Sequence, residues 1–146
     1  MTTLDLATAE LDIRADAVFG AAADPMPLLT ARARELLAGH EVIVWEADAT
    51  TFIFSYVSPE AEAVLGYPAS RWTDEPTFWA DVVLLADDRD ESITYCASET
   101  AQCRDHSFEY RAVAADGRIV RLRDIVRVIP AEDGAPARLR GVMVVR

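Results

Sequence analysis

The segment Arg104–Ile129, RDHSFEYRAVAADGRIVRLRDIVRVI, decides the fold of this chain. Apolar and polar side chains alternate on both sides of its Asp116-Gly117 pair. This pattern predicts a β-hairpin, because Gly takes the positive φ of the turn and successive strand side chains point to opposite faces. A further apolar run, Leu139–Val145, follows a short connection. The C-terminal third is therefore predicted to be a three-stranded antiparallel meander with one apolar face.

The rest of the chain is expected to cover that apolar face. Two more strands are predicted at Val42–Ala47 and Phe52–Val57. Both are apolar on both faces, as strands of a sheet covered on two sides are. Ser58-Pro59 is typical of a helix start, since Ser is a preferred N-cap and Pro suits the first helical position. Short helical pieces follow, and the longest helix of this region is predicted from Asp87 to Gln102.

Residues 1–39 are predicted to form a helical extension ahead of the main domain. A second helix, Pro27–Ala38, ends at Gly39, a typical stop residue. Another helix is predicted ahead of Pro27–Ala38, where apolar residues seven apart make a stripe at helical spacing. Two interpretations of that stripe stay open: a cap packed on the domain, or a dimer interface formed by Leu4, Leu11, Val18 and Phe19.

The composition is that of a folded, acidic protein. With 146 residues and 51% hydrophobic content, the chain can form one domain with a real core plus an extension. Its formal charge of −11 repels phosphate groups, so neither nucleic acid nor a membrane is expected as a partner. We find no membrane span, secretory signal or disulfide framework, and expect a cytoplasmic protein. All 14 basic residues are Arg, which indicates a biased, bacterial genome composition.

Residues that could carry chemistry are few. His40 and His106 are expected at the surface, and no His/Cys cluster has metal-ligand spacing. The chain has no phosphate-binding loop and no nucleophile motif. Asp87 and Asp88 open a predicted helix, where carboxylates act as caps and dipole partners. The sequence therefore predicts no catalytic residue, no metal site and no enzyme.

Several short stretches, in this order and spacing, resemble a PAS domain over roughly residues 40–146. They are Val44–Asp48, Tyr56–Pro59, Leu65–Tyr67, Arg71-Trp72, Phe78-Trp79, Asp87–Arg89, Phe108–Arg111 with Asp116, Gly117 and Asp124, and Leu139–Val142. Two positions depart from the pattern: Leu85-Ala86 replaces a common His-Pro, and Arg121 replaces a frequent aromatic. The chain ends before the Asp-Ile-Thr segment that usually leads into the next domain, so we expect a module of a longer protein.

The resemblance implies an α+β fold, a PAS-like five-stranded antiparallel sheet with helices covering one face, plus N-terminal helices. PAS domains sense small molecules, light or redox state, or hold partners, and their pocket lies between sheet and helices. Small-ligand sites typically have apolar walls that carry a few polar side-chain groups. The alternative is that the side chains only fill one another's space. The residues expected to line the pocket are Phe54, Tyr56, Trp72, Phe78, Val82, Ile93, Cys96, Phe108, Tyr110 and Leu122.

The resemblance makes no positive prediction of a cofactor. Haem-binding members typically carry their axial His on the long helix, and Asp87–Gln102 contains none; Tyr95 or Cys96 would remain as iron ligands. The Asn-Cys run of the flavin photosensors is missing, because the chain has no Asn. Neither haem nor flavin is expected, and the cofactor is left unknown.

The function implied is a sensory module. It would bind a small apolar or amphipathic ligand, form a homodimer, and pass its signal to a fused or partner effector such as a histidine kinase or a cyclic-dinucleotide enzyme. One alternative is a ligand-free PAS dimerisation module. A remote alternative is an enzyme with the cone-shaped fold of the nuclear-transport-factor type, whose pocket can host an Asp/His dyad. The early strand pair within residues 42–57 weighs against that fold.

Overall fold

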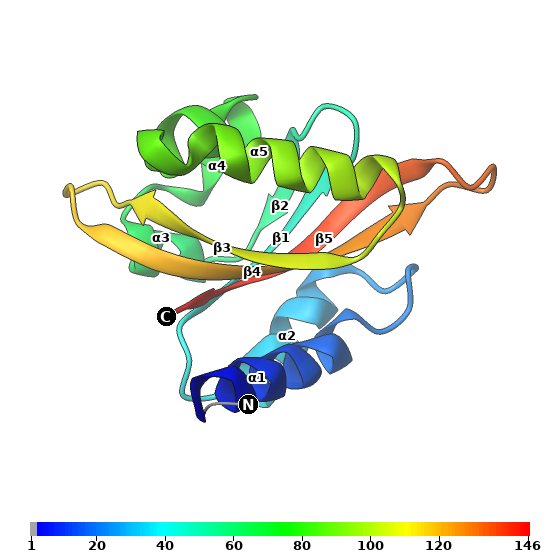
Figure 1. Ribbon diagram of the computed structural model, residues 1–146, viewed down its shortest axis with the longest axis horizontal. Helices are drawn as coiled ribbons and strands as arrows, with labels where there is room; N and C mark the ends of the chain where they lie inside the picture. Colours follow the sequence, from blue (N-terminus) through cyan, green and yellow to red (C-terminus); the bar gives the residue numbers. More distant parts are fainter. Residues whose placement is uncertain (1–2) are drawn as a thin grey trace.

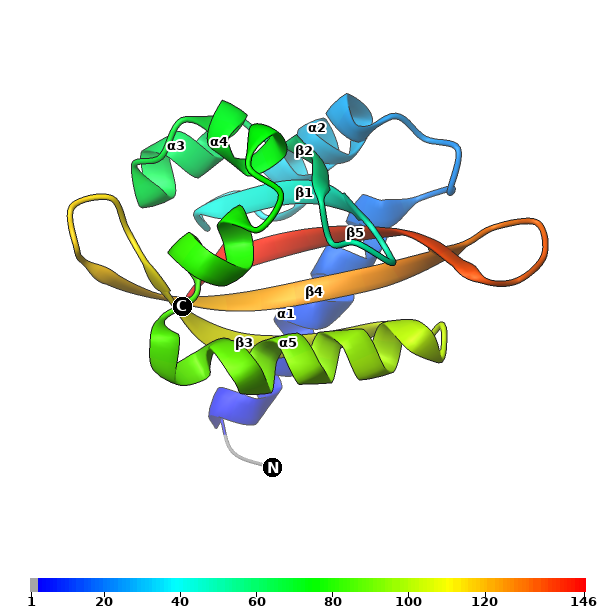
Figure 2. The same cartoon turned by 90° about the horizontal axis from the view of Figure 1, so that it is seen from above.

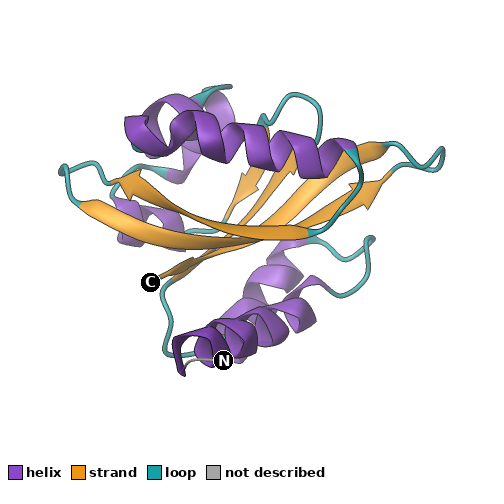
Figure 3. Ribbon diagram, viewed as in Figure 1, coloured by secondary structure: helices purple, strands orange, loops and turns teal. Residues whose placement is uncertain are grey.

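A five-stranded antiparallel sheet lies between two layers of helices (Figures 1 and 3). The computed structural model describes residues 3–146, with side chains from residue 6 onward. The strand order is β2-β1-β5-β4-β3. The predicted α+β class and PAS-like sheet are thereby confirmed. The strands are β1 (Val42–Asp48), β2 (Phe54–Val57), β3 (His106–Val113), β4 (Ile119–Pro130) and β5 (Pro136–Val145).

The helices divide between the two faces of the sheet. We call the face under the central helices the inner face and the opposite one the outer face. Figure 2 shows α5 running along β3, with α3 and α4 over the part of the sheet formed by β1 and β2. The inner helices are α3 (Glu60–Leu65), α4 (Ala69–Asp74), the π-helix η1 (Trp79–Val83) and α5 (Ala86–Ala101); the outer ones are α1 (Thr3–Phe19) and α2 (Met26–Leu36). None of the described helices is long and apolar enough to cross a membrane.

The C-terminal meander forms as its alternation predicts. Strands β3 and β4 pair with Tyr110 opposite Leu122, and Gly117 takes a φ of +90° in the turn between them. Strand β5 then pairs along β4 and carries β1 on its other edge. Strand β1 is covered on both faces: Ile43 and Trp45 belong to the inner core, and Val44 belongs to the outer one.

One extra residue in β2 reverses the predicted orientation of Tyr56. Consecutive β1 residues Glu46 and Ala47 pair with Tyr56 and Phe54, so Ser55 has no partner on β1 and forms a β-bulge. Phe54 therefore faces inward, whereas Tyr56 packs in the outer core. There its hydroxyl donates to Thr30 Oγ1 of α2 at 2.7 Å. The prediction that Tyr56 lines the inner pocket is wrong, because strict alternation fails at a bulge.

Helix α1 packs its apolar stripe on the outer face of its own sheet. Leu11, Val18 and Phe19 are buried there beside Ile125 and other strand residues. These three side chains are therefore not available to a second copy of the chain, and their predicted use as a dimer interface is wrong in this arrangement. The fourth residue of that prediction, Leu4, lies outside the residues whose side chains the structure describes.

A row of polar contacts fixes α1 across the sheet. Asp12 accepts two hydrogen bonds from Arg123 of β4, at 2.8 and 2.7 Å. One turn later Asp16 forms an ion pair with Arg127, whose guanidinium also lies 4.7 Å from the centre of the Phe19 ring. Partly exposed ion pairs contribute only about 0–1 kcal/mol each, so the buried apolar stripe supplies most of the stability and the arginines set the register.

Candidate functional site

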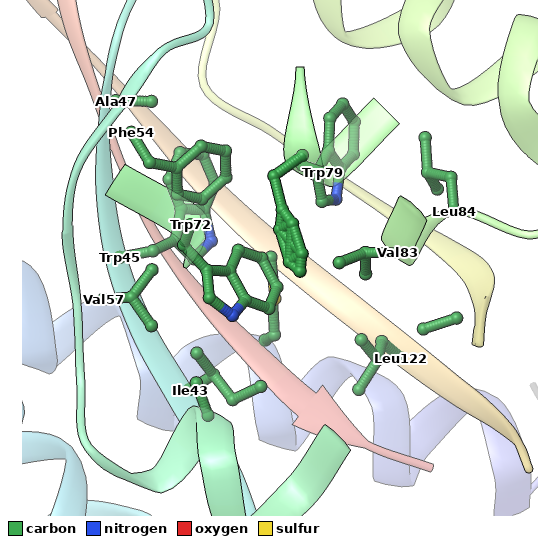
Figure 4. Packing of buried hydrophobic residues seen from close by; sticks show 14 of the residues in the cluster. Ile43, Trp45, Ala47, Phe54, Val57, Trp72, Trp79, Val83, Leu84 and Leu122 are labelled. Atoms are coloured by element: carbon green, nitrogen blue, oxygen red, sulfur yellow. The ribbon is translucent and has the colours of Figure 1, made fainter. Parts of the chain in front are cut away.

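Aromatic rings fill most of the space between the sheet and the inner helices (Figure 4). The Trp45 and Phe54 rings lie 5.2 Å apart, Phe54 lies 5.5 Å from Trp72, and Trp72 meets Phe78 edge to face at 5.4 Å. These separations are the ones that aromatic pairs prefer. The interior of the domain is thus a packed aromatic core.

One small cavity of about 10 Å³ remains inside this core. It has room for about one water molecule. The closed cavity is too small for any organic group, and no step is assigned to a flavin or a haem. Among the described residues, no cluster of His, Cys, Asp and Glu side chains could hold a metal ion. The cavity is lined by Trp45, Ala47, Phe52, Phe54, Trp79, Cys96, Phe108, Asp124 and Leu139.

A buried carboxyl group, Asp124 of β4, forms the polar part of the cavity wall. Its side chain belongs to a residue only 1% exposed. Trp45 Nε1 of β1 donates to Asp124 Oδ1 at 2.9 Å, and the Tyr110 hydroxyl of β3 donates to Oδ2 at 2.9 Å. The Tyr110 oxygen in turn accepts a hydrogen bond from Trp79 Nε1 at 3.2 Å. This network joins three strands to the π-helix η1.

Burial changes the ionisation of this network. Removal from water raises the pKa of Asp124 to about 7, and the hydrogen bonds from Trp45 and Tyr110 only partly oppose that rise. Burial and the nearby carboxyl also raise the pKa of Tyr110 well above its ordinary value. Asp124 is therefore a group in the interior that changes charge near neutral pH.

Cys96 of α5 and His106 of β3 form a second buried pair beside the cavity. The His106 Nε2 atom lies 3.3 Å from the Cys96 Sγ atom, and its Nδ1 lies 2.9 Å from the carbonyl oxygen of Arg104. Because a carbonyl only accepts, Nδ1 carries a proton, and in the neutral ring Nε2 accepts from the thiol. Burial raises the pKa of Cys96 to about 12. The thiol thus stays protonated and inert, and the expectation that His106 is at the surface is wrong.

The predicted pocket residues are spread over the inner core and do not meet at one cavity. Only Phe54, Cys96 and Phe108 line it. Buried elsewhere on the inner side are Trp72, Phe78, Tyr110 and Leu122, and partly buried against the same core are Val82 and Ile93. Trp72 is notable because its Nε1 atom is buried with no hydrogen-bond partner among the described residues. Leaving such a group unpaired costs about 1–3 kcal/mol.

Sequence reasoning missed Asp124 as a cavity residue, although a signal was present. Asp124 lies two residues after Leu122 and two before Val126, so the alternation places its side chain on the apolar face. Because Asp124 is an acidic residue, it was not expected on the buried face. Trp45 was predicted to lie in a strand but was not assigned to the pocket. Phe52 was predicted to begin a strand, but it lies in the turn before β2, which starts at Phe54, so alternation could not place its side chain.

The acidic residues Asp87 and Asp88 lie in the first turn of α5 as predicted, but neither caps the helix with its side chain. Asp88 accepts from the backbone N–H and the guanidinium of Arg111 in β3, at 2.6–2.9 Å. The Arg111 charge and hydrogen bonds lower the pKa of Asp88. Arg89 donates to the carbonyl groups of Ala80 and Asp81 in η1. These contacts hold α5 and η1 over the cavity.

We predict that Gly141→Ala disrupts the contact between Trp45 and Asp124. Gly141 pairs with Trp45, and a Cβ atom at Gly141 would lie 2.2 Å from Trp45 Cε2, so the indole must move away from Asp124. The expected loss is about 2–4 kcal/mol in the free energy of unfolding. Denaturant titration checks this. Gly141 has no positive φ, so Gly134→Ala, whose φ is +85° and whose added Cβ contacts nothing, shows the cost of backbone strain without a clash. Wild-type stability in Gly141→Ala would contradict the prediction.

We also predict a pH dependence of stability that belongs to Asp124. Its pKa is raised from the ordinary 3.8 to about 7, so the folded state holds this proton more tightly than the unfolded state does. Stability should therefore fall as the pH rises from about 4 to about 7, by up to about 4 kcal/mol. Asp124→Asn should flatten this part of the curve in urea titrations at several pH values. An unchanged curve would refute the assignment.

Comparison with known proteins agrees with this architecture. The family model described as "PAS fold" matches residues 54–143. The N-terminal domain of a diguanylate cyclase with a PAS/PAC sensor from Marinobacter aquaeolei is 31% identical, with a TM-score of 0.63, covering 70% of this chain and 92% of that one. No curated protein matches the chain.

More distant structures share the fold alone. A domain of a putative light and redox sensing histidine kinase from Haloarcula marismortui has a TM-score of 0.61 at 19% identity, covering 79% of this chain and 97% of that one. A light-oxygen-voltage domain studied with a flavin analogue has a TM-score of 0.61 at 10% identity, covering 80% and 84%. With this sheet, these helices and the match over residues 54–143, the chain belongs to the PAS family.

Proposed function

We propose that this PAS domain is a sensory module that binds a small apolar or amphipathic organic ligand in its inner core. The observation that carries the proposal is the Asp124–Tyr110–Trp45 network buried beside a cavity. A core built only for stability gains little from a carboxyl group that must be desolvated. The unpaired indole nitrogen of Trp72 is a second buried polar group on the same side of the sheet that a ligand could satisfy.

Binding would require the core to open, because the cavity of about 10 Å³ is smaller than any organic ligand. A ligand would then favour an expanded arrangement of the inner helices over the closed one. Its effect on the output is bounded by its difference in affinity for those two states. The alternative is a core that is only packed and has no ligand-bound state.

The output would be passed to an effector, either fused to the domain or bound to it. The names of two similar proteins, a diguanylate cyclase and a histidine kinase, support an effector of the cyclic-dinucleotide or kinase type. In this scheme residues 40–146 are the PAS domain and residues 1–39 its N-terminal extension. We assign no catalysis to the chain itself, since the raised pKa of Cys96 keeps its thiol neutral and unreactive.

The ligand proposal predicts a co-purified small molecule. Native mass spectrometry of the purified domain should show a fraction of the protein with an added mass, which is lost on denaturation. Cys96→Phe adds a ring from α5 into the cavity wall and should abolish the adduct. Ser98→Phe, on the exposed side of the same helix, is the matched control and should keep it. A wild-type protein without adduct, or an equal adduct in Cys96→Phe, would count against ligand binding.

A second candidate function, dimerisation without a ligand, is favoured by the exposed side of α1. Leu6 and Ile13 lie seven residues apart on this helix and are 56% and 70% exposed, opposite the stripe that packs on the sheet. Two such sides could pair between copies. This replaces Leu11, Val18 and Phe19 as the surface proposed for the homodimer.

The dimer proposal predicts that Ile13→Asp halves the mass measured by light scattering. A charge in an apolar helix–helix contact is strongly unfavourable. Ile119→Asp changes another exposed isoleucine, 53% exposed and far along the chain in β4, and should leave the mass unchanged. A monomeric wild-type protein, or a dimer that survives Ile13→Asp, would remove α1 from the interface.

A further inference from the structure

We propose that the ligand of the inner cavity is a small organic cation, an ammonium group carried on an apolar or aromatic body, with Asp124 as its counter-ion and Phe52 as the side chain that moves to admit it. This inference rests on the proposed function, because it names the chemical class of a ligand for the same cavity. It goes further by assigning the charge of that ligand and the place of entry.

The walls of the cavity have the composition of a cation site. Of the nine residues that line it, five are aromatic, two are small or aliphatic, one is Cys96 and one is Asp124. Aromatic faces attract cations through their quadrupole, most strongly where water is excluded. No Arg or His lines the cavity, so an anionic ligand would meet a carboxyl group and no positive charge.

Asp124 lacks a positive partner among the described residues. The ion pairs found in the structure use the arginines on the surface and the outer face, and none of them reaches Asp124. Its two oxygen atoms accept only from the neutral groups of Trp45 and Tyr110. Each carboxylate oxygen has more than one lone pair, so both can accept a further hydrogen bond. An ammonium group would supply the charge and the donors together.

Phe52 lines the cavity with its backbone in a strained conformation. It lies in the turn between β1 and β2 with a φ of +58°, a left-handed conformation that bulky side chains rarely adopt. Asp48 holds this turn, because its Oδ1 atom accepts from the backbone N–H groups of Thr50 and Thr51, both at 2.8 Å. Gly or Asn would fit such a position without strain. Phe52 is the lining residue that lies in this turn and is only partly buried, which makes it the side chain best placed to move.

The charge state of the site follows from the groups that face Asp124. These are Tyr110 from β3, Trp45 from β1 and Cys96 from α5. Tyr110 and Cys96 have raised pKa values and stay neutral near pH 7, so of the groups that face Asp124 neither changes its charge there. His106 contacts Cys96 and makes no hydrogen bond to Asp124 among the described residues. Because a cation prefers the ionised carboxylate, its affinity should rise by about tenfold from pH 6 to pH 8 as Asp124 loses its proton.

Benzylamine and benzyl alcohol test the charge assignment. The two probes have nearly the same shape, but only benzylamine is a cation in this pH range. In titration calorimetry on the domain freed of co-purified ligand by refolding, benzylamine should bind more tightly than benzyl alcohol, and only its affinity should rise with pH. Asp124→Asn should reduce the benzylamine affinity by about tenfold and remove its pH dependence, while benzyl alcohol binding stays as it was. His106→Gln should keep the pH dependence.

Phe52→Ala tests the place of entry. It removes a ring of the size of the probe, and an apolar cavity of that size binds such a ring. We expect benzylamine to bind this variant about tenfold more tightly than wild type, since the closed state no longer competes. Ile53→Ala, the neighbouring residue that does not line the cavity, should bind as wild type does.

The outcomes separate this inference from the proposed function. Equal binding of the two probes, or benzylamine binding that Asp124→Asn leaves unchanged, would overturn the cation assignment while leaving a ligand-binding domain. An unchanged affinity in Phe52→Ala would overturn the role of Phe52. If neither probe binds to wild type or to Phe52→Ala, the inference fails, and the native mass spectrum decides separately whether another class of ligand is bound.

Discussion

The Asp124 carboxyl group is the constraint on which the inner half of this domain depends. It lies on β4, yet it is bonded to Trp45 on β1, with β5 between them. The indole can cross β5 only because Gly141, its partner in the pairing, has no side chain there. Tyr110 completes the contact from β3 on the other side. Three of the five strands are thereby joined around one carboxyl group, across a fourth, and the aromatic core is arranged around it.

Much of this architecture was predictable from periodicity. The alternation around Gly117 predicted β3 and β4, and the two apolar faces of the Val42–Ala47 strand correctly indicated helical layers on both sides. Helix α5 lies within one residue of its predicted bounds, because its acidic first turn marks the start clearly. These successes share a cause: each depends on a local repeat that burial on a given face requires.

The parts that could not be predicted depend on contacts between distant residues or on irregular backbone. Because Ser55 has no partner on β1, Tyr56 lies on the outer face of the sheet and not on the inner one. No side-chain pattern marks such a bulge in advance. The stripe on α1 was recognised, but its partner, the protein's own sheet, could not be told from a second chain. For the same reason His106 was expected at the surface, since its contact with Cys96 joins β3 to α5.

The pleat of β4 has a consequence for how the two faces of the domain can influence one another. Arg123, which holds Asp12 of α1, and Asp124, which faces the interior, are consecutive residues with side chains on opposite sides. Their Cα atoms are separated by one peptide unit, about 3.8 Å. The backbone path from the buried acid to the arginine that holds α1 is thus a single peptide unit. Rotation of that single peptide unit would move the Arg123 guanidinium on the outer face and the Asp124 carboxyl group on the inner face together.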